Sequence, residues 1–298
     1  MAGGGERDLR LVGGLLRYWL NRSQLSLGYR LTREALGRTA VAGDDRLRRT
    51  ALTIAGQLGG QLGLHDQARK MHDEAIDIAR RDGDPEELAD ALNGSGQTRV
   101  EQGDLAGART QIEESLKLAT QVGTDSQTFG TAALMLGELE RLEGNWIRAQ
   151  SLYEASLSIA RRQGDARRIA TNLNNLVMNS IALARSDGVR EMLVEAMQHG
   201  QQVSIVYGPV FPLMLCAGLA TLRGDWEVAA RFEGAARFHF AELQWPLDPA
   251  DRAYLESLSS RTRTALGDSG FGRAREAGRA LALDEALAQV RQYLSDQT

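Results

Sequence analysis

Small and apolar side chains recur along this chain at spacings of three and four, which is the period of an amphipathic α-helix. The clearest stripes are Leu88, Ala91, Leu92, Ser95 and Gly96, then Ala108, Ile112, Ser115, Leu116 and Ala119, and then Ile169, Leu173, Leu176 and Val177. No run of residues shows the strict alternation that is typical of a half-buried β-strand. The pattern therefore predicts an all-α fold.

Turn signals interrupt the helical pattern at regular intervals. Glycines with the same phase stand at Gly63, Gly103, Gly144 and Gly224, at successive intervals of 40, 41 and 80 residues. The doubled interval predicts a degenerate turn between Ala184 and Gly188, and one step back from the first glycine predicts a turn near Ser23. The chain is thus predicted to contain six units of about 40 residues.

A second set of glycines divides each unit in two. Gly83, Gly123 and Gly164 follow polar or basic helix ends, where glycine suits the left-handed C′ position. Asp84 and Pro85 then have the order of an N-cap followed by the first helical residue. Each unit is therefore predicted to hold two helices. Because such a unit cannot bury its apolar face alone, the units are expected to stack as a solenoid.

The order of small residues within the units resembles the tetratricopeptide repeat. The matching positions are Gly56, Gly96 and Gly137 on the first helices, and Ala68, Ala108, Ala149 and Ala229 on the second helices. The resemblance implies a right-handed superhelical solenoid of about six helix pairs. The period is 40 rather than 34 residues, and Arg99 and Glu140 replace a tyrosine of the family pattern. Armadillo or HEAT repeats are the structural alternative, although the Gly-Asp turns argue against them.

Two further segments carry a second resemblance. Residues 225–298 resemble the end of the repeat segment in large bacterial signal-transduction ATPase regulators of LuxR or antibiotic-regulatory type. Residues 9–19 resemble the segment that follows the nucleotide-binding and winged-helix modules of the same regulators. This resemblance implies that the chain is the sensor region of such a transcriptional regulator. We find neither a phosphate-binding loop nor a basic recognition helix in the sequence. The expected organisation is a flexible N-terminus at 1–7, a repeat array at 8–240, and a C-terminal helical cap at 241–298 that packs on the array, with two or three helices from Asp248.

Composition narrows the function classes. The 298 residues include 35 basic and 39 acidic residues, so there is no basic excess that would favour direct nucleic-acid binding. The single cysteine, Cys216, cannot form an internal disulfide. The longest apolar run, Val210 to Leu222, is shorter than the roughly 20 residues that a membrane-spanning helix needs. With no apparent signal peptide, we expect a cytoplasmic protein that does not enter a membrane.

Candidate chemistry is sparse. His65 and His72 are two helical turns apart, but Asp66 and Glu74 lie on poorly matched faces, so a site with three or four metal ligands is not expected. Cys216 lies in an apolar run and is interpreted as a packing residue rather than a nucleophile. We therefore predict no metal site, no cofactor, no catalytic residue and no enzymatic activity.

The tetratricopeptide resemblance also implies a ligand groove along the first helices. The positions that would face this groove are Gln57, Asn93, Gln97, Glu138, Arg141, Asn174 and Met178. The alternative is that these polar side chains are merely tolerated on a wet surface. Trp146 and Trp226 are expected to pack between units, and Trp19 and Trp245 either cap the core or mark an interface at the array ends.

The sequence as a whole favours recognition without chemistry. The expected ligand is a protein, a peptide or a small inducer, and the pattern is compatible with a homo-oligomer. The alternatives are a stand-alone tetratricopeptide adaptor or peptide receptor and, more remotely, an undescribed enzyme.

Overall fold

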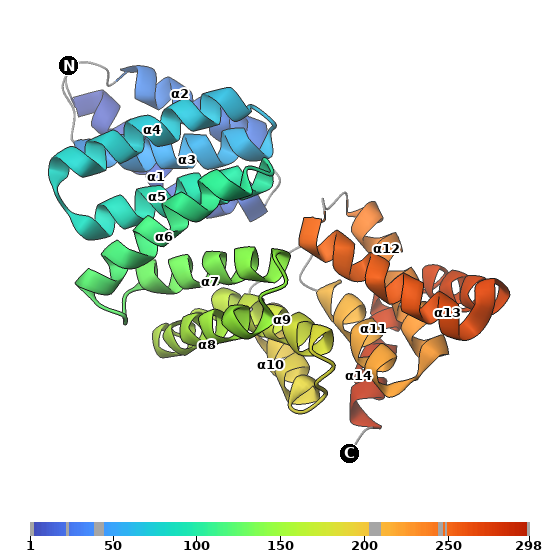
Figure 1. The fold of residues 1–298 in the computed structure, drawn as a ribbon. Coiled ribbons are helices and arrows are strands. Elements are labelled where there is room, and N and C mark those ends of the chain that lie inside the picture. The colour runs from blue at the N-terminus through green and yellow to red at the C-terminus, as the bar shows by residue number, and fades with distance from the viewer. Residues whose placement is uncertain are drawn as a thin grey trace. The chain divides into compact units, whose positions relative to one another are not determined.

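The computed structural model describes residues 3–21, 24–38, 45–202, 210–243, 247 and 249–296. Within these residues it contains fourteen α-helices and no β-strand, so the predicted all-α class is confirmed (Figure 1). The chain divides into two compact units, Met1–Leu139 and Glu140–Thr298, which are described separately below.

The first unit consists of consecutive helix pairs. Its helices are α1 (Gly3–Asn21), α2 (Leu25–Arg38), α3 (Asp45–Gln61), α4 (His65–Asp82), α5 (Pro85–Glu101), α6 (Leu105–Val122) and most of α7 (Gln127–Leu142). Each helix from α1 to α5 packs on the next one, and α3 also packs on α1 and on α5. First helices of consecutive pairs therefore lie side by side, as stacked two-helix repeats require. Helix α1 begins at Gly3, so residues 3–7 are helical where a flexible segment was expected.

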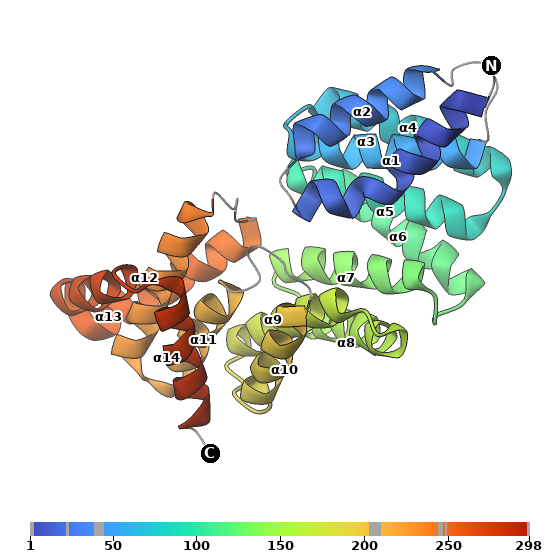
Figure 2. The same cartoon turned by 180° about the vertical axis from the view of Figure 1, so that it is seen from behind.

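The second unit continues the pairs and ends in a helical group. Its helices after α7 are α8 (Trp146–Gln163), α9 (Ala166–Ala182), α10 (Val189–Gln202), α11 (Phe211–Arg223), α12 (Trp226–Glu242), α13 (Pro249–Arg279) and α14 (Leu283–Ser295). Helix α9 packs on α8, α10 and α11, while α13 and α14 both contact α11 and α12, as the view from behind shows for α14 and α11 (Figure 2). Gly267 has non-helical dihedral angles and divides α13, so three helical segments follow α12.

One hydrogen-bond motif closes the first helix of five consecutive pairs. At the first of these turns the Gly63 N–H donates to the Gly60 carbonyl at 2.9 Å, and the Leu64 N–H donates to the Gly59 carbonyl at 2.8 Å. This is the Schellman arrangement, with the C′ residue in the left-handed region. The same pair of bonds recurs with Gly103, Gly144, Ala184 and Gly224 as the C′ residue. The predicted 40-residue phase, including the degenerate turn, is thereby confirmed.

Helix starts and small residues also follow the sequence pattern. The Asp84 carboxylate accepts hydrogen bonds from the backbone N–H groups of Glu86 and Glu87, so the predicted N-cap is confirmed. The repeat-defining Ala68, Ala108 and Ala149 are completely buried, and Ala229 is buried as well.

Each unit has its own hydrophobic core. In the first unit the core includes the side chain of Trp19, whose indole lies against Gly28 of α2. Trp19 is therefore a core residue of the first helix pair. In the second unit Cys216 is completely buried among apolar residues of α9, α11 and α12, and burial raises the pKa of its thiol well above the usual range. Trp146 and Trp226 are half-buried, and Trp245 lies outside the described residues.

Candidate functional site

Four of the predicted groove residues lie in the first unit, and they differ in how far solvent reaches their side chains. Gln97 in α5 is exposed, and its amide donates to the Glu101 carboxylate at 3.5 Å. Gln57 in α3 and Glu138 in α7 are half-buried. Asn93 is buried and donates to the backbone carbonyl of Thr128 at 3.4 Å, so it links α5 to α7 rather than facing solvent.

The other three predicted groove residues lie in the second unit. Asn174 in α9 is half-buried, whereas Met178 in the same helix is buried in the core. Arg141 is buried too: its Nη1 approaches the Met178 sulfur at 3.9 Å and its Nη2 lies 3.7 Å from the Asp251 carboxylate in α13. The expectation of solvent-facing side chains therefore differs from the structure at Asn93, Arg141 and Met178, because neighbouring helices cover these positions.

The small first-helix residues are where the helices of a pair cross. A Cβ atom added at Gly96 would come within 2.6 Å of Ile112 in α6, and one added at Gly56 would come within 2.5 Å of the His72 ring in α4. Gly137 in α7 is buried. His72 and Ile112 occupy the same repeat position, nine residues after the turn glycine. The buried histidine is thus a polar variant of an apolar packing position.

The environment of His72 keeps its imidazole neutral. Its Nε2 lies 2.9 Å from the Thr98 hydroxyl, and burial, together with the nearby Arg99, lowers the pKa of His72 to about 4. His65 is exposed on the same helix. Across the part of the chain that the structure describes, no group of three or more His, Cys, Asp or Glu side chains is arranged to hold a metal ion.

Arg99 and Glu140, which stand where the family pattern has a tyrosine, make polar contacts within their helix pairs. Arg99 in α5 donates to Gln111 in α6 at 3.2 Å and to the Asp104 carboxylate at 2.5 Å. A hydrogen bond from the Gly107 N–H, together with Arg99, holds the pKa of Asp104 below its usual range. In the next pair the charges are reversed, since the buried Glu140 accepts from Asn145 at 2.8 Å and pairs with Arg148 at 3.2 Å. These hydrogen bonds and ion pairs connect the two helices within each pair.

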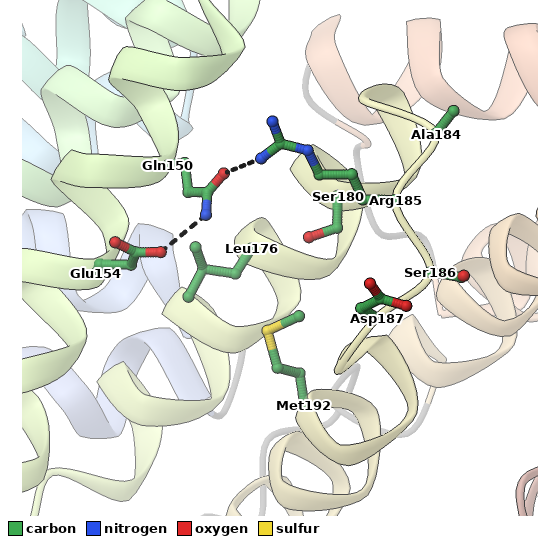
Figure 3. A pocket seen from close by; sticks show the side chains of 9 residues that line it. All are labelled: Gln150, Glu154, Leu176, Ser180, Ala184, Arg185, Ser186, Asp187 and Met192. Atoms are coloured by element: carbon green, nitrogen blue, oxygen red, sulfur yellow. Dashed lines mark hydrogen bonds between the residues drawn. The ribbon is translucent and has the colours of Figure 1, made fainter.

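A pocket of about 400 Å³ lies in the second unit, beside the degenerate turn. It is lined by Gln150 and Glu154 of α8, Leu176 and Ser180 of α9, Ala184, Arg185, Ser186 and Asp187 of the turn, and Met192 of α10. Figure 3 shows Gln150 and Glu154 on one side and Ser186 and Asp187 on the other, with Leu176 and Met192 between them.

The pocket combines an apolar floor with a negative rim. Arg185 donates to the Gln150 side chain at 3.4 Å, and Gln150 in turn donates to Glu154 at 2.9 Å (Figure 3). The two carboxylates of the rim outnumber its one guanidinium, so the lining favours a ligand with a positive charge and a small apolar part. Sequence reasoning missed this pocket. The only sequence feature that could have indicated it is Ala184, which stands where the other turns have glycine and so marks an irregular turn.

Comparisons with known proteins agree with the helical-repeat geometry. Residues 47–121, which span α3 to α6, match the family model of the tetratricopeptide repeat. A crystal structure titled BtubC (BKLC) from P. vanneervenii is similar to this chain with a TM-score of 0.55 and 16% sequence identity, over 82% of this chain and 94% of that one. At this identity the likeness concerns the fold alone. No curated protein matches the chain.

These findings define the fold class of the protein and identify one repeat segment within it. Residues 47–121 match the tetratricopeptide repeat, and the described residues of the whole chain form an all-α helical-repeat fold. Tetratricopeptide repeats generally mediate protein–protein interaction. Among the described residues, no helix is both long enough and apolar enough to cross a membrane.

Proposed function

We propose that this chain is a non-catalytic recognition scaffold of the cytoplasm, and that it acts as the sensor or interaction domain of a bacterial transcriptional regulator. The observation that carries the recognition role is the match of residues 47–121 to the tetratricopeptide repeat. The regulator role is supported by residues 225–298, whose order of small and apolar residues resembles the end of the repeat segment in those regulators.

The accessible part of the first-helix face is the proposed contact surface for a protein or peptide. Gln57 and Gln97 belong to consecutive first helices, α3 and α5, which pack side by side. Their amides can both donate and accept hydrogen bonds, which suits the main chain of an extended peptide. Arg141 and Met178 are not part of this surface because they are buried.

Site-specific photo-crosslinking in cells tests this surface. A photoreactive amino acid is placed at Gln97, which is exposed on a first helix, and at Lys70, which is exposed on the second helix α4. We expect a discrete crosslinked partner from position 97 and none from position 70. Identical crosslinks from both positions, or none from position 97, would contradict a first-helix recognition face.

The proposal for a small inducer places it in the pocket beside the degenerate turn. The carboxylates of Glu154 and Asp187 favour an organic cation or the basic side chain of a peptide. Isothermal titration with a panel of small amines tests this, with Asp187→Asn expected to weaken binding at least several-fold. Arg162→Gln, which changes an exposed charge on α8 outside the pocket, is the matched control and should leave binding unchanged.

The regulator role is tested separately at the level of the gene. We expect the reading frame that encodes these residues to encode an ATPase module and a DNA-binding module as well. A frame that encodes only these helical repeats would contradict the regulator role and would favour a stand-alone adaptor or peptide receptor.

A further inference from the structure

The turn between α9 and α10 is longer than the corresponding turns of the neighbouring pairs. Helix α8 begins two residues after Gly144 and α12 begins two residues after Gly224, whereas α10 begins five residues after Ala184. Residues 185–187 belong to the lengthened turn, and all three line the pocket of about 400 Å³ beside it. Insertions in helical repeats are often found on the binding face. The lengthened turn therefore supplies the pocket with side chains that the other turns lack.

The pocket contains both signs of charge, and its arginine is not paired with its carboxylates. The Arg185 guanidinium donates to the neutral side chain of Gln150 at 3.4 Å, and Gln150 donates to the Glu154 carboxylate at 2.9 Å (Figure 3). Across the described residues, Arg185 forms no ion pair with Glu154 or Asp187. The Gln150 amide thus stands between the guanidinium and one carboxylate, and both signs of charge are left for a ligand to compensate.

An apolar floor lies between the carboxylates. Leu176 of α9 is 5% exposed and Met192 of α10 is half-buried, and Figure 3 shows both between Glu154 and Asp187. A methionine side chain adapts its shape to what it contacts, so this floor suits a short aliphatic group. The Ser180 hydroxyl lines the same pocket without a hydrogen-bond partner among the described residues, and it can donate or accept one.

We propose that this pocket binds a free α-amino acid with an aliphatic side chain. The inference rests on the proposed inducer site and names the class of its ligand. Arg185 binds the ligand's carboxylate in place of Gln150, because a guanidinium forms stronger hydrogen bonds to a charged acceptor than to a neutral one. Glu154 and Asp187 bind the α-ammonium group. The aliphatic side chain then covers the apolar floor.

The arrangement of charges distinguishes this ligand class from simple amines and from simple carboxylic acids. An amine would bring a second positive charge near Arg185 without an anion to compensate it. A carboxylic acid would bring a third carboxylate near Glu154 and Asp187 without a cation. Because like charges that approach each other in a binding site disfavour the wrong partner, a ligand that carries both charges is preferred.

Isothermal titration of the full chain with four small molecules tests the ligand class. The probes are L-leucine, L-leucinamide and 3-methylbutylamine, which lack the carboxylate, and 4-methylpentanoate, which lacks the ammonium group. We expect L-leucine to bind, the two amines to bind at least tenfold more weakly, and 4-methylpentanoate to show no measurable binding.

Arg185→Met tests the carboxylate end of the ligand by itself. We expect this variant to bind L-leucine at least tenfold more weakly and to bind 3-methylbutylamine no more weakly than the wild type does. Arg185 is exposed, so circular dichroism should show an unchanged helical signal. Arg162→Met is the matched control, because Arg162 is an exposed arginine of α8 outside the pocket, and it should leave the affinity for L-leucine unchanged.

The outcomes separate this inference from the proposed inducer site. If 3-methylbutylamine bound as tightly as L-leucine and Arg185→Met had no effect on L-leucine, the amino-acid ligand would be overturned and the cation site would stand. Equal affinities for L-leucinamide and L-leucine would overturn the free amino acid in favour of a peptide N-terminus. If none of the four probes bound, both the amino-acid ligand and the inducer site would be overturned.

Discussion

The Nη2 of Arg141, near the end of α7, lies 3.7 Å from the carboxylate Oδ1 of Asp251 in α13, and both side chains are buried. Arg141 precedes Asp251 by 110 residues, so the ion pair joins the start of the second unit to its C-terminal helical group. A buried charge is tolerated only where another group compensates it. This relationship explains why an arginine occupies a helix position that sequence analysis assigned to a ligand groove.

Removing one partner of this pair should destabilise the second unit strongly. We expect Arg141→Met to lower the free energy of unfolding by about 3 kcal/mol, because the Asp251 carboxylate would remain buried without its guanidinium. Arg141→Met/Asp251→Leu should lose less than the sum of the two single substitutions. Urea denaturation followed by circular dichroism measures each value.

The exposed ion pair between Arg161 and Glu195 provides the control for the buried one. These groups approach to 2.7 Å, but half of the Arg161 side chain is accessible to solvent. We expect Arg161→Met to lower the free energy of unfolding by less than about 1 kcal/mol. Equal losses for Arg161→Met and Arg141→Met would show that burial is not the determining factor.

The features that sequence analysis predicted correctly depend on local interactions. A Schellman turn and an N-cap each involve residues within one helical turn, so Gly63, Gly103 and Asp84 carry their own signals. The residues that were expected to face solvent but are buried, such as Arg141, depend on partners that lie far away in the sequence. Arg141 is covered by Asp251, and nothing in the local sequence indicates that contact. The pocket beside Ala184 likewise needs residues of three consecutive helices, from Gln150 to Met192, so no single turn or cap indicates it.

Ala184 has a left-handed backbone with a φ of 54°, at the turn position where the neighbouring repeats have Gly144 and Gly224. The left-handed conformation costs a non-glycine residue about 1–2 kcal/mol, and glycine loses about 0.5–1 kcal/mol in extra chain entropy. We therefore expect Ala184→Gly to raise the free energy of unfolding by about 0.5–1 kcal/mol. The reverse substitution, Gly144→Ala, should lower it by about 1 kcal/mol. Chemical denaturation of both variants checks the signs, and a loss of stability in Ala184→Gly would contradict the repeat alignment.

The stability of the first unit should depend on pH through His72. The pKa of this imidazole is about 4 in the folded chain against 6.5 as the ordinary value, so the unfolded chain binds more protons between these limits. Stability is thus full above about pH 6.5 and decreases as the pH falls towards 4, by about 3 kcal/mol in total. Denaturation midpoints measured from pH 4 to pH 7.5 should show this decrease.

His72→Ile isolates the contribution of this group, because the equivalent position in the next pair already holds Ile112 opposite Gly96. We expect this variant to lose most of the decrease between pH 6.5 and pH 4. His65→Gln, which changes an exposed histidine on the same helix, should keep the full decrease. If His72→Ile retained the wild-type pH profile, the decrease would have to be assigned to other groups.

Helices α12 and α13 approach closely where Gly278 lies over the backbone of α12. A Cβ added at Gly278 would overlap the carbonyl oxygen of Arg231, and a backbone atom cannot move aside as a flexible side chain can. Gly272 lies six residues earlier on α13, is exposed, and has no atom within 4 Å of its Cβ position. We expect Gly278→Ala to lower the free energy of unfolding of the second unit by about 2–3 kcal/mol through overpacking. Gly272→Ala should instead raise it by about 1 kcal/mol, because alanine favours the helix without a new contact. Urea denaturation measures the free energy of unfolding of both variants. A close helix crossing at Gly278 requires changes of opposite sign in the two variants, and an equal change in both would rule it out.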